Sequence, residues 1–222
     1  MKSRVVTKGY LQVPGVDFTE KFSPVASDTS TRIMIGMTLY FSDKYSWVCE
    51  TFDAEAAFLK PYLGIEMYID WPEGIIELGF ISEEQKCDTC VQLRRSMYGN
   101  VNAALCWQKD FTEFLVSECG FKVCRSDPCI LFLVEDKKLK VVMSTHVDDW
   151  MCSGSREDLD KLYQNVHKKY KITTLGHLKK HLGAHYDWKI KKSGEQYVIA
   201  TMTKNSEEIV EYYEKVTGKR LN

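Results

Sequence analysis

The chain has 222 residues, of which 44% are hydrophobic and 12% aromatic, and its formal net charge is −1. These values are typical of one globular domain or two small ones and exclude a disordered chain. No stretch approaches the ~20 apolar residues of a membrane span, and the start lacks a signal peptide's apolar segment, so we expect an intracellular protein with no membrane partner.

The charge is unevenly distributed along the chain. Residues 61–150 carry 9 basic and 15 acidic side chains, whereas residues 151–222 carry 14 basic and 9 acidic ones. A basic C-terminal third is compatible with a polyanionic partner, and charge alone is equally compatible with a solvated, lysine-rich surface. The eight cysteines are expected to be reduced thiols.

Hydrophobic periodicity and turn residues predict the elements in the first hundred residues. They are a strand over 4–8, a helix over 28–41, a strand over 47–53, a helical turn over 54–59, a strand over 66–71 and then a loop to residue 89.

The remaining residues predict a regular series of elements. They are a helix over 102–119, two strands over 129–134 and 139–147, a return strand over 151–153, a helix over 155–170, a helical turn over 178–182, a hairpin of 184–190 with 196–201, and a last helix from residue 203. Gly120 ends the first of these helices and Ser155 caps the second.

From residue 46 the order is therefore strand, long insertion, helix, strand, strand, helix, strand. This order predicts an α+β fold with a ferredoxin-like split βαβ antiparallel sheet and helices on one face. Asp53 ends the first strand, and Asp148 and Asp149 lie at the tip of the central hairpin. The two strands are neighbours in that topology, so we expect three carboxylates to converge at one edge of the sheet.

Adjacent aspartates in an apolar strand repel each other and lose hydration. A bound cation or a solvated surface turn would relieve this cost. Three converging carboxylates suit Mg²⁺, with Mn²⁺ as an alternative ion, and a two-metal site for phosphoryl transfer.

Six blocks of sequence resemble the reverse transcriptase domain of Ty1/copia-type retrotransposons, in that family's order. They are Lys8-Gly9-Tyr10 with residues 12–18 and 22–25, Asp53-Ala54-Glu55-Ala56-Ala57-Phe58-Leu59, Ser96-Met97-Tyr98-Gly99 followed by Trp107, Ser126-Asp127-Pro128-Cys129, His146-Val147-Asp148-Asp149, and residues 175–179 with Leu182-Gly183. His146 stands where the family carries a tyrosine.

The resemblance implies an RNA-directed DNA polymerase with right-hand architecture. Residues 1–45 would be partial fingers, 46–190 the palm with a fingers insertion at about 60–100, and 191–222 a hairpin strand and helix leading toward the thumb or connection. The partners would be an RNA or DNA template with primer and deoxynucleoside triphosphates, in a cytoplasmic virus-like particle or in the nucleus.

The resemblance also assigns site residues. The catalytic and metal ligands would be Asp53, Asp148 and Asp149. The nucleotide-binding residues would be Arg4, Lys8, Ala56, Ala57, Phe58, Tyr98 and Gly99, with Phe58 as the steric gate. The primer and template contacts would be His146, Leu182, Gly183, Lys179 and Lys180.

Several alternatives stay open from the sequence alone. Phe58 is as well explained as a core side chain, and Arg4 and Lys8 as exposed charges on an edge strand. The chain is expected to be a fragment of a polyprotein, or a truncated, inactive remnant that at most binds nucleic acid. A structural remnant with no partner is a third hypothesis. A zinc site built from Cys87, Cys90 and two of the histidines 177, 181 and 185 is the weakest alternative.

Overall fold

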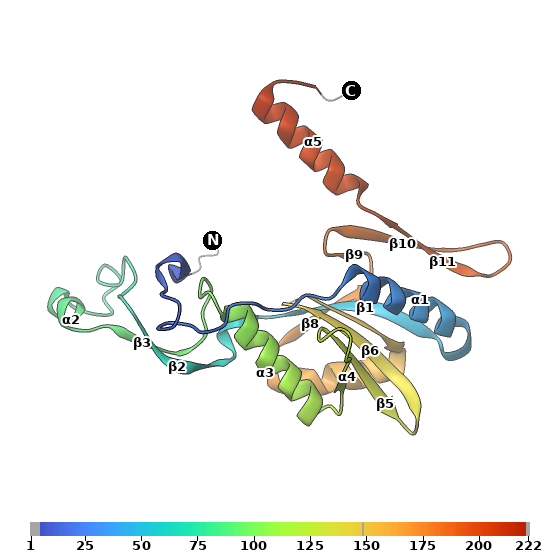
Figure 1. Ribbon diagram of the computed structural model, residues 1–222, viewed down its shortest axis with the longest axis horizontal. Coiled ribbons are helices and arrows are strands. Elements are labelled where there is room, and N and C mark those ends of the chain that lie inside the picture. Colours follow the sequence, from blue (N-terminus) through green and yellow to red (C-terminus); the bar gives the residue numbers. More distant parts are fainter. Residues whose placement is uncertain (1–4, 148, 221–222) are drawn as a thin grey trace.

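The computed structural model describes residues 5–147 and 149–220, with no side chain for Lys204. It is a mixed α/β structure with a central sheet, a long extension on one side and a projecting C-terminal helix (Figure 1). The helices are α1 (Asp28–Tyr45), α2 (Glu83–Asp88), α3 (Ala103–Ser117), α4 (Arg156–Lys169) and α5 (Thr203–Thr217).

The strands form three separate sheets. They are β1 (Trp47–Ala54), β2 (Tyr62–Ile69), β3 (Val91–Arg95), β4 (Lys122–Val123), β5 (Ile130–Glu135), β6 (Lys138–His146), β7 (Asp149–Ser155), β8 (Ile172–His177), β9 (Lys180–His181), β10 (Ala184–Ile190) and β11 (Gln196–Thr201). The six-stranded sheet has the order β4-β5-β6-β7-β1-β8, and each neighbouring pair in it is antiparallel. The strand β1 therefore lies between the hairpin strand β7 and the later strand β8.

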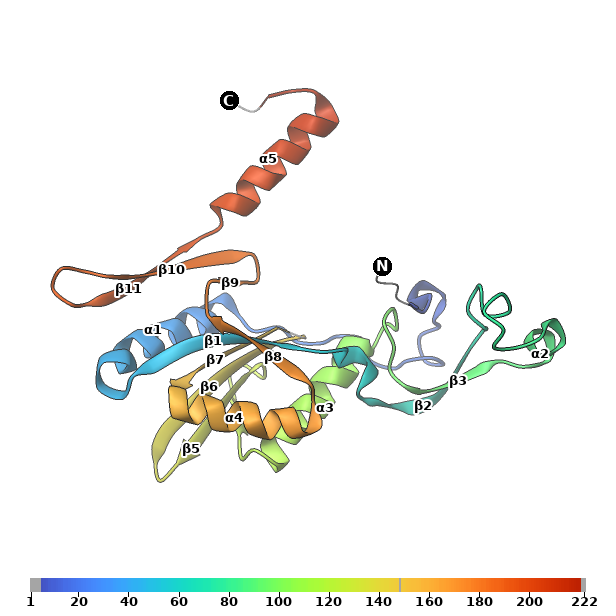
Figure 2. The ribbon, with the colours of Figure 1, turned by 180° about the vertical axis from the view of Figure 1, so that it is seen from behind.

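Helices cover both faces of the six-stranded sheet. On one face, Met34 and Ile35 of α1 pack in a cluster with Trp47, Cys49 and Met151 of the sheet. Figure 2 shows α1 on one side of the sheet and α3 with α4 on the other. The expectation of helices on one face holds for α3 and α4. It was wrong for the sheet as a whole, because α1, grouped above with the fingers, buries its apolar stripe against β1 and β7.

Aromatic rings fill the core beneath α3 and α4. Phe111 stacks on Trp150 with ring centroids 3.9 Å apart, and Trp107 stacks on Phe111 at 5.3 Å. Tyr170 meets Trp107, Phe111 and Phe114 edge-on. Stacked and edge-to-face pairs of this kind add to the free energy gained by burying the rings. This cluster lies directly under the β6–β7 hairpin, because Trp150 belongs to β7.

The strand that completes the six-stranded sheet differs from the predicted one. Residues 172–177 form β8 beside β1, whereas the predicted strand 184–190 is β10 of the separate sheet β11-β10-β9. The predicted helical turn over 178–182 was also wrong, since β9 occupies part of it. Isoleucine and two threonines at 172–174 are β-branched and favour a strand once β1 offers a partner.

The insertion between β1 and α3 is an extended arm. Its core is the two-stranded ribbon β2–β3, and α2 lies at its far end (Figure 1). The region expected to be loop contains α2, which begins with a capping box between Ser82 and Gln85. The predicted strand over 4–8 was wrong for its described residues 5–8, which form no strand and lead into a 3₁₀ helix at Gly9–Leu11.

The C-terminal helix α5 follows β11 and extends away from the three-stranded and six-stranded sheets (Figures 1 and 2). Within the described part of the chain, no helix is long and apolar enough to cross a membrane.

Candidate active site

Two of the three predicted carboxylates lie side by side at the end of the central strands. Asp53 of β1 is the register partner of Asp149 of β7, and both side chains are exposed. His146 of β6 is in turn the register partner of Asp149. The pairing predicted between the first strand and the hairpin is therefore confirmed. Asp148 lies outside the described residues. Exposed carboxylate oxygens on paired strands are the donors that hard cations prefer.

The hairpin tip is held by a buried indole. The Nε1–H of Trp107 donates a 2.8 Å hydrogen bond to the carbonyl oxygen of Val147. Val147 has φ of 54°, a left-handed conformation that is a genuine outlier for a β-branched residue. Such outliers persist only where the surroundings over-determine them. Trp107, fully buried in the aromatic cluster, supplies that constraint.

The turn after Asp53 leads directly to Phe58. The amide of Glu55 donates to the carbonyl of Lys171, at 2.8 Å, which ties this turn to the start of β8. Ala56 has a left-handed backbone, with φ of 54°, and is the N-cap of the 3₁₀ helix Ala57–Leu59. The first residue of this helix, Ala57, is buried and anchors it to the core. Phe58 is half-buried and packs against the core on one side.

Tyr98, at the end of the insertion, faces Phe58. The rings of Phe58 and Tyr98 meet edge-to-face, with centroids 5.2 Å apart. The amide of Thr7 donates to the carbonyl of Tyr98, at 2.8 Å, so the N-terminal segment crosses behind this turn. Lys8, the next residue, is exposed. Arg4 lies outside the described residues.

The predicted primer and template residues come from two regions, the β6–β7 tip and the segment around β9. His181 of β9 is buried. Burial, together with the nearby imidazole of His146, lowers the pKa of His181 to about 4. Leu182 and Gly183 form the following turn, both with positive φ. Lys179 and Lys180 are exposed beside it.

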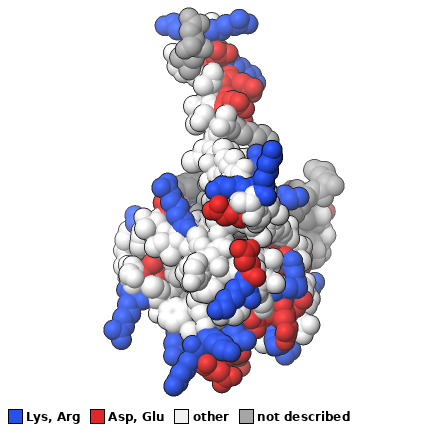
Figure 3. Space-filling view, turned by 90° about the vertical axis from the view of Figure 1, so that its right-hand side faces the viewer, with Lys and Arg blue, Asp and Glu red and all other residues white. Residues whose placement is uncertain are grey.

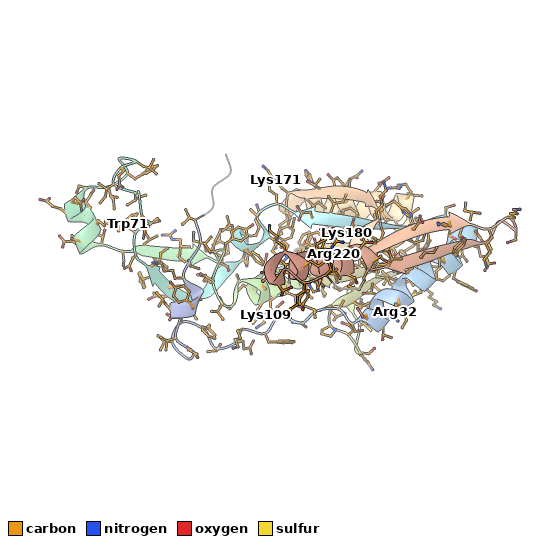
Figure 4. The ribbon with its side chains drawn as sticks, turned by 90° about the horizontal axis from the view of Figure 1, so that it is seen from above. Arg32, Trp71, Lys109, Lys171, Lys180 and Arg220 are labelled. Carbon is orange, nitrogen blue, oxygen red and sulfur yellow. The ribbon has the colours of Figure 1, made fainter. Side chains whose placement is uncertain are left out.

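Charges are mixed both near these residues and at the opposite end of the sheet. Figure 3 views that opposite end, where the β5–β6 and β10–β11 turns lie, and shows Lys and Arg interspersed with Asp and Glu, with no unbroken basic field. Lys171 lies 3.9 Å from Glu55, and Lys169 lies 3.7 Å from Asp110, so part of the basic excess of this region is offset locally. We call the six-stranded sheet with α1, α3 and α4 the central body. In Figure 4, Lys171 and Lys180 lie over the central body, whereas Trp71 lies far out on the arm.

No group of three or more His, Cys, Asp and Glu side chains is arranged to hold a metal ion among the residues that the structure describes. Cys87 and Cys90 lie at the end of α2 and just before β3, out on the arm, so they do not meet the histidines of the central body. The zinc alternative finds no support in this arrangement.

A family model described as reverse transcriptase (RNA-dependent DNA polymerase) matches residues 1–213. The chain belongs to the reverse transcriptase family. This reverse transcriptase domain is 34% identical over 173 residues to the retrovirus-related Pol polyprotein from transposon RE1 of Arabidopsis thaliana, a match covering 76% of the chain and 11% of that protein.

Two further relatives of the same kind match the chain to a similar extent. The Pol polyproteins from transposon RE2 of Arabidopsis thaliana and transposon TNT 1-94 of Nicotiana tabacum are each 32% identical, over 76% and 82% of the chain and 11% and 13% of their own lengths. The resemblance to Ty1/copia-type reverse transcriptases is confirmed. The matches span about an eighth of these relatives. No solved structure gives a significant match.

Sequence reasoning about this reverse transcriptase domain missed two supports of the site. Trp107 was part of a motif, but its hydrogen bond to the hairpin tip joins residues 40 positions apart. Thr7 lies in the stretch from Arg4 to Lys8, and no sequence pattern sets it apart. Only the folded chain brings it to Tyr98.

Proposed function

We propose that this domain is the palm and part of the fingers of a right-hand polymerase, and that it synthesises DNA on an RNA or DNA template. The pairing of Asp53 with Asp149, beside the hairpin tip that carries Asp148, is the observation that supports this most directly. The strand order β6-β7-β1-β8, with α3 and α4 as the crossovers, supports the proposed ferredoxin-like split βαβ palm.

The proposed reaction joins a nucleotide to a primer end. The primer 3′-hydroxyl oxygen forms a bond to the α-phosphorus of a deoxynucleoside triphosphate. The bond from that phosphorus to the bridging oxygen breaks, pyrophosphate leaves, and the hydroxyl proton passes to solvent.

Asp53, Asp148 and Asp149 would hold Mg²⁺, or Mn²⁺ in its place. The donor set fits, because carboxylate oxygens at paired strand positions match the preference of hard cations. When bound, the ions would supply charge stabilisation at the attacking and leaving oxygens.

The remaining residues would position the reactants. The amides of Ala56 and Ala57 would meet the triphosphate, with Arg4 and Lys8 as phosphate contacts. Phe58 would occupy the space of a ribose 2′-hydroxyl, with Tyr98 and Gly99 beside it. His146, Leu182, Gly183, Lys179 and Lys180 would hold the primer and template.

Primer extension by the purified chain tests this proposal. We expect Mg²⁺-dependent incorporation on RNA and DNA templates, and a loss of at least about 10³-fold in rate for Asp53→Asn or Asp148→Asn, since the ion ligands are removed. Asp43→Asn, an exposed substitution in α1, is the matched control and should retain the wild-type rate.

The alternative function is a remnant that binds nucleic acid without polymerising. Binding that weakens with salt, together with no incorporation by the wild type, would favour that alternative. Equal incorporation by the wild type and Asp148→Asn would overturn the assignment of the metal site.

A further inference from the structure

The side chain proposed as the steric gate has two neighbours. Phe58 packs against the core beneath the sheet. Its ring also meets the ring of Tyr98 edge-to-face, at an interplanar angle of 85°. The ring of Phe58 can shift toward either neighbour only if that neighbour also shifts. The position of Tyr98 therefore bears on the space that Phe58 leaves for the nucleotide sugar.

The backbone of Tyr98 is held from behind by Thr7. The Thr7 amide donates to the carbonyl of Tyr98 at 2.8 Å. The Thr7 hydroxyl lies 3.1 Å from the same carbonyl and 2.6 Å from the side-chain oxygen of Asn100, which is buried. Thr7 thus contacts the residues that precede and follow Gly99 in the sequence, Tyr98 and Asn100.

Two glycines bring the N-terminal segment and this turn into direct backbone contact. A Cβ added at Gly9 would overlap the carbonyl oxygen of Gly99, and a Cβ added at Gly99 would overlap the carbonyl oxygen of Thr7. Further along, the side chain of Gln12 accepts a 2.7 Å hydrogen bond from the amide of Val101. The contact therefore recurs at Thr7, Gly9 and Gln12, and we name residues 7–12 the strap.

We propose that the strap sets sugar selectivity, with Thr7 as a positioning residue that acts through Tyr98 on Phe58. This inference rests on the proposed role of Phe58 as the gate. Removing the Thr7 hydroxyl releases Asn100 and weakens the hold on the Tyr98 backbone, so the Tyr98 ring no longer confines Phe58. The site then admits a ribose 2′-hydroxyl, and ribonucleotides bind better while deoxyribonucleotides bind about as before.

The test measures nucleotide binding without chemistry. The full chain is bound to a primer–template whose primer ends in a dideoxynucleotide. The dissociation constants of the matched dNTP and rNTP are then measured, and their ratio is the selectivity. We expect Thr7→Val to lower the ratio about fivefold, the equivalent of one lost hydrogen bond. Tyr98→Leu, which removes the edge contact itself, should lower it at least as much.

Conservative and remote variants separate positioning from general damage. Thr7→Ser keeps the hydroxyl and should retain the wild-type ratio. Thr201→Val, an exposed threonine of β11, is the matched control and should also retain it. A purely structural role for Thr7 would weaken both nucleotides equally and leave their ratio unchanged. That result, or a wild type that binds both sugars equally, would overturn the proposal.

The outcomes for the two proposals are distinguishable. If the wild type prefers dNTPs in this assay and Thr7→Val reduces the preference, the inference holds even when primer extension fails. If extension succeeds and the ratio is insensitive to Thr7, the polymerase assignment stands and the role of the strap is wrong.

Discussion

His181 is a buried imidazole beside the hairpin tip, with only 4% of its surface exposed. Its folded-state pKa of about 4 lies below the 6.5 of an unperturbed histidine. As the pH falls below 6.5, the unfolded chain binds the proton first, so the folded state loses stability down to about pH 4. The loss should be about 1.4 kcal/mol per pH unit in this window.

Urea unfolding between pH 7 and 4 checks this expectation. His181→Phe removes the titrating group at similar volume and should flatten the curve between pH 6.5 and 4. His167→Gln, on the exposed face of α4, should keep the wild-type slope. Parallel profiles for the wild type and His181→Phe would show that another group dominates this pH range.

Gly9 lies where no side chain fits. We expect Gly9→Ala to destabilise the fold by about 1–3 kcal/mol, because the added methyl group overlaps the carbonyl of Gly99. Gly64→Ala in β2 is the matched control, with open space around the new Cβ, and should change stability by less than about 0.5 kcal/mol. Thermal or urea unfolding of both variants measures the difference, and equal effects would contradict the close contact.

At this scale the sequence allowed the position of the two carboxylates to be predicted, but not the groups that support them. Asp53 lies near the end of β1 and Asp149 at the start of β7, so the pairing of these two strands brings them together. Thr7 and Trp107 act through hydrogen bonds between residues far apart in the sequence. Periodicity carries no information about such bonds, because they depend on how the elements pack.

Among the elements, the N-terminus of α1 is joined to the loop before β5 by one carboxylate. Asp127, in the loop before β5, accepts hydrogen bonds from the Ser27 amide at 3.0 Å, the Ser30 hydroxyl at 2.6 Å and the Cys129 amide at 3.0 Å. Ser27 is the N-cap of α1. Burial alone would raise the pKa of Asp127, but these donors hold it below its usual value.

Asp127→Ala should therefore cost about 2–4 kcal/mol, since it leaves the buried Cys129 amide, the Ser27 amide and the Ser30 hydroxyl without their acceptor. For the wild type, the contribution of this carboxylate is present above its unfolded pKa near 3.9 and is lost as the pH falls through the lower folded value. Asp17→Ala is the control. Asp17 accepts a bond from the exposed Val13 amide, and its loss should cost less than about 1 kcal/mol. Similar urea midpoints for the two variants would contradict the role of Asp127.

Long amphipathic elements could be predicted from the sequence, whereas short edge elements could not. The helices α1, α3 and α4 carry regular apolar stripes, and Ser155 was correctly expected to cap α4. The strands β3, β4 and β8 were missed. Each lies at an edge or in the arm, where a strand is decided by the partner that it meets rather than by its own residues.

For the whole molecule, the central body and α5 are largely independent. The last helix exposes Ile209, Tyr212 and Val216, at 68%, 70% and 64% of their surface, and projects from the sheets (Figure 1). The helix comes close to the turn after β9, where the side chain of Asn205 lies beside Gly183. Ile209, Tyr212 and Val216 form an apolar stripe that covers no core among the residues that the structure describes.

A chain ending at Met202 should thus unfold with nearly the same free energy as the full chain, within about 0.5 kcal/mol. It should also self-associate less, because an exposed apolar stripe is removed. Urea unfolding and sedimentation velocity measure the two effects. A stability loss of more than about 2 kcal/mol would show that α5 packs on the body in solution.

The hydrogen bond from Trp107 to Val147 gives the hairpin tip a built-in spectroscopic probe. Trp107 is one of five tryptophans, and its indole proton is donated to the carbonyl that immediately precedes Asp148. The chemical shift of an indole N–H follows the length of the hydrogen bond that it makes. A single resonance, assigned by replacing Trp107, would therefore register any displacement of the tip when ions, nucleotide or primer arrive, without a label placed in the site itself.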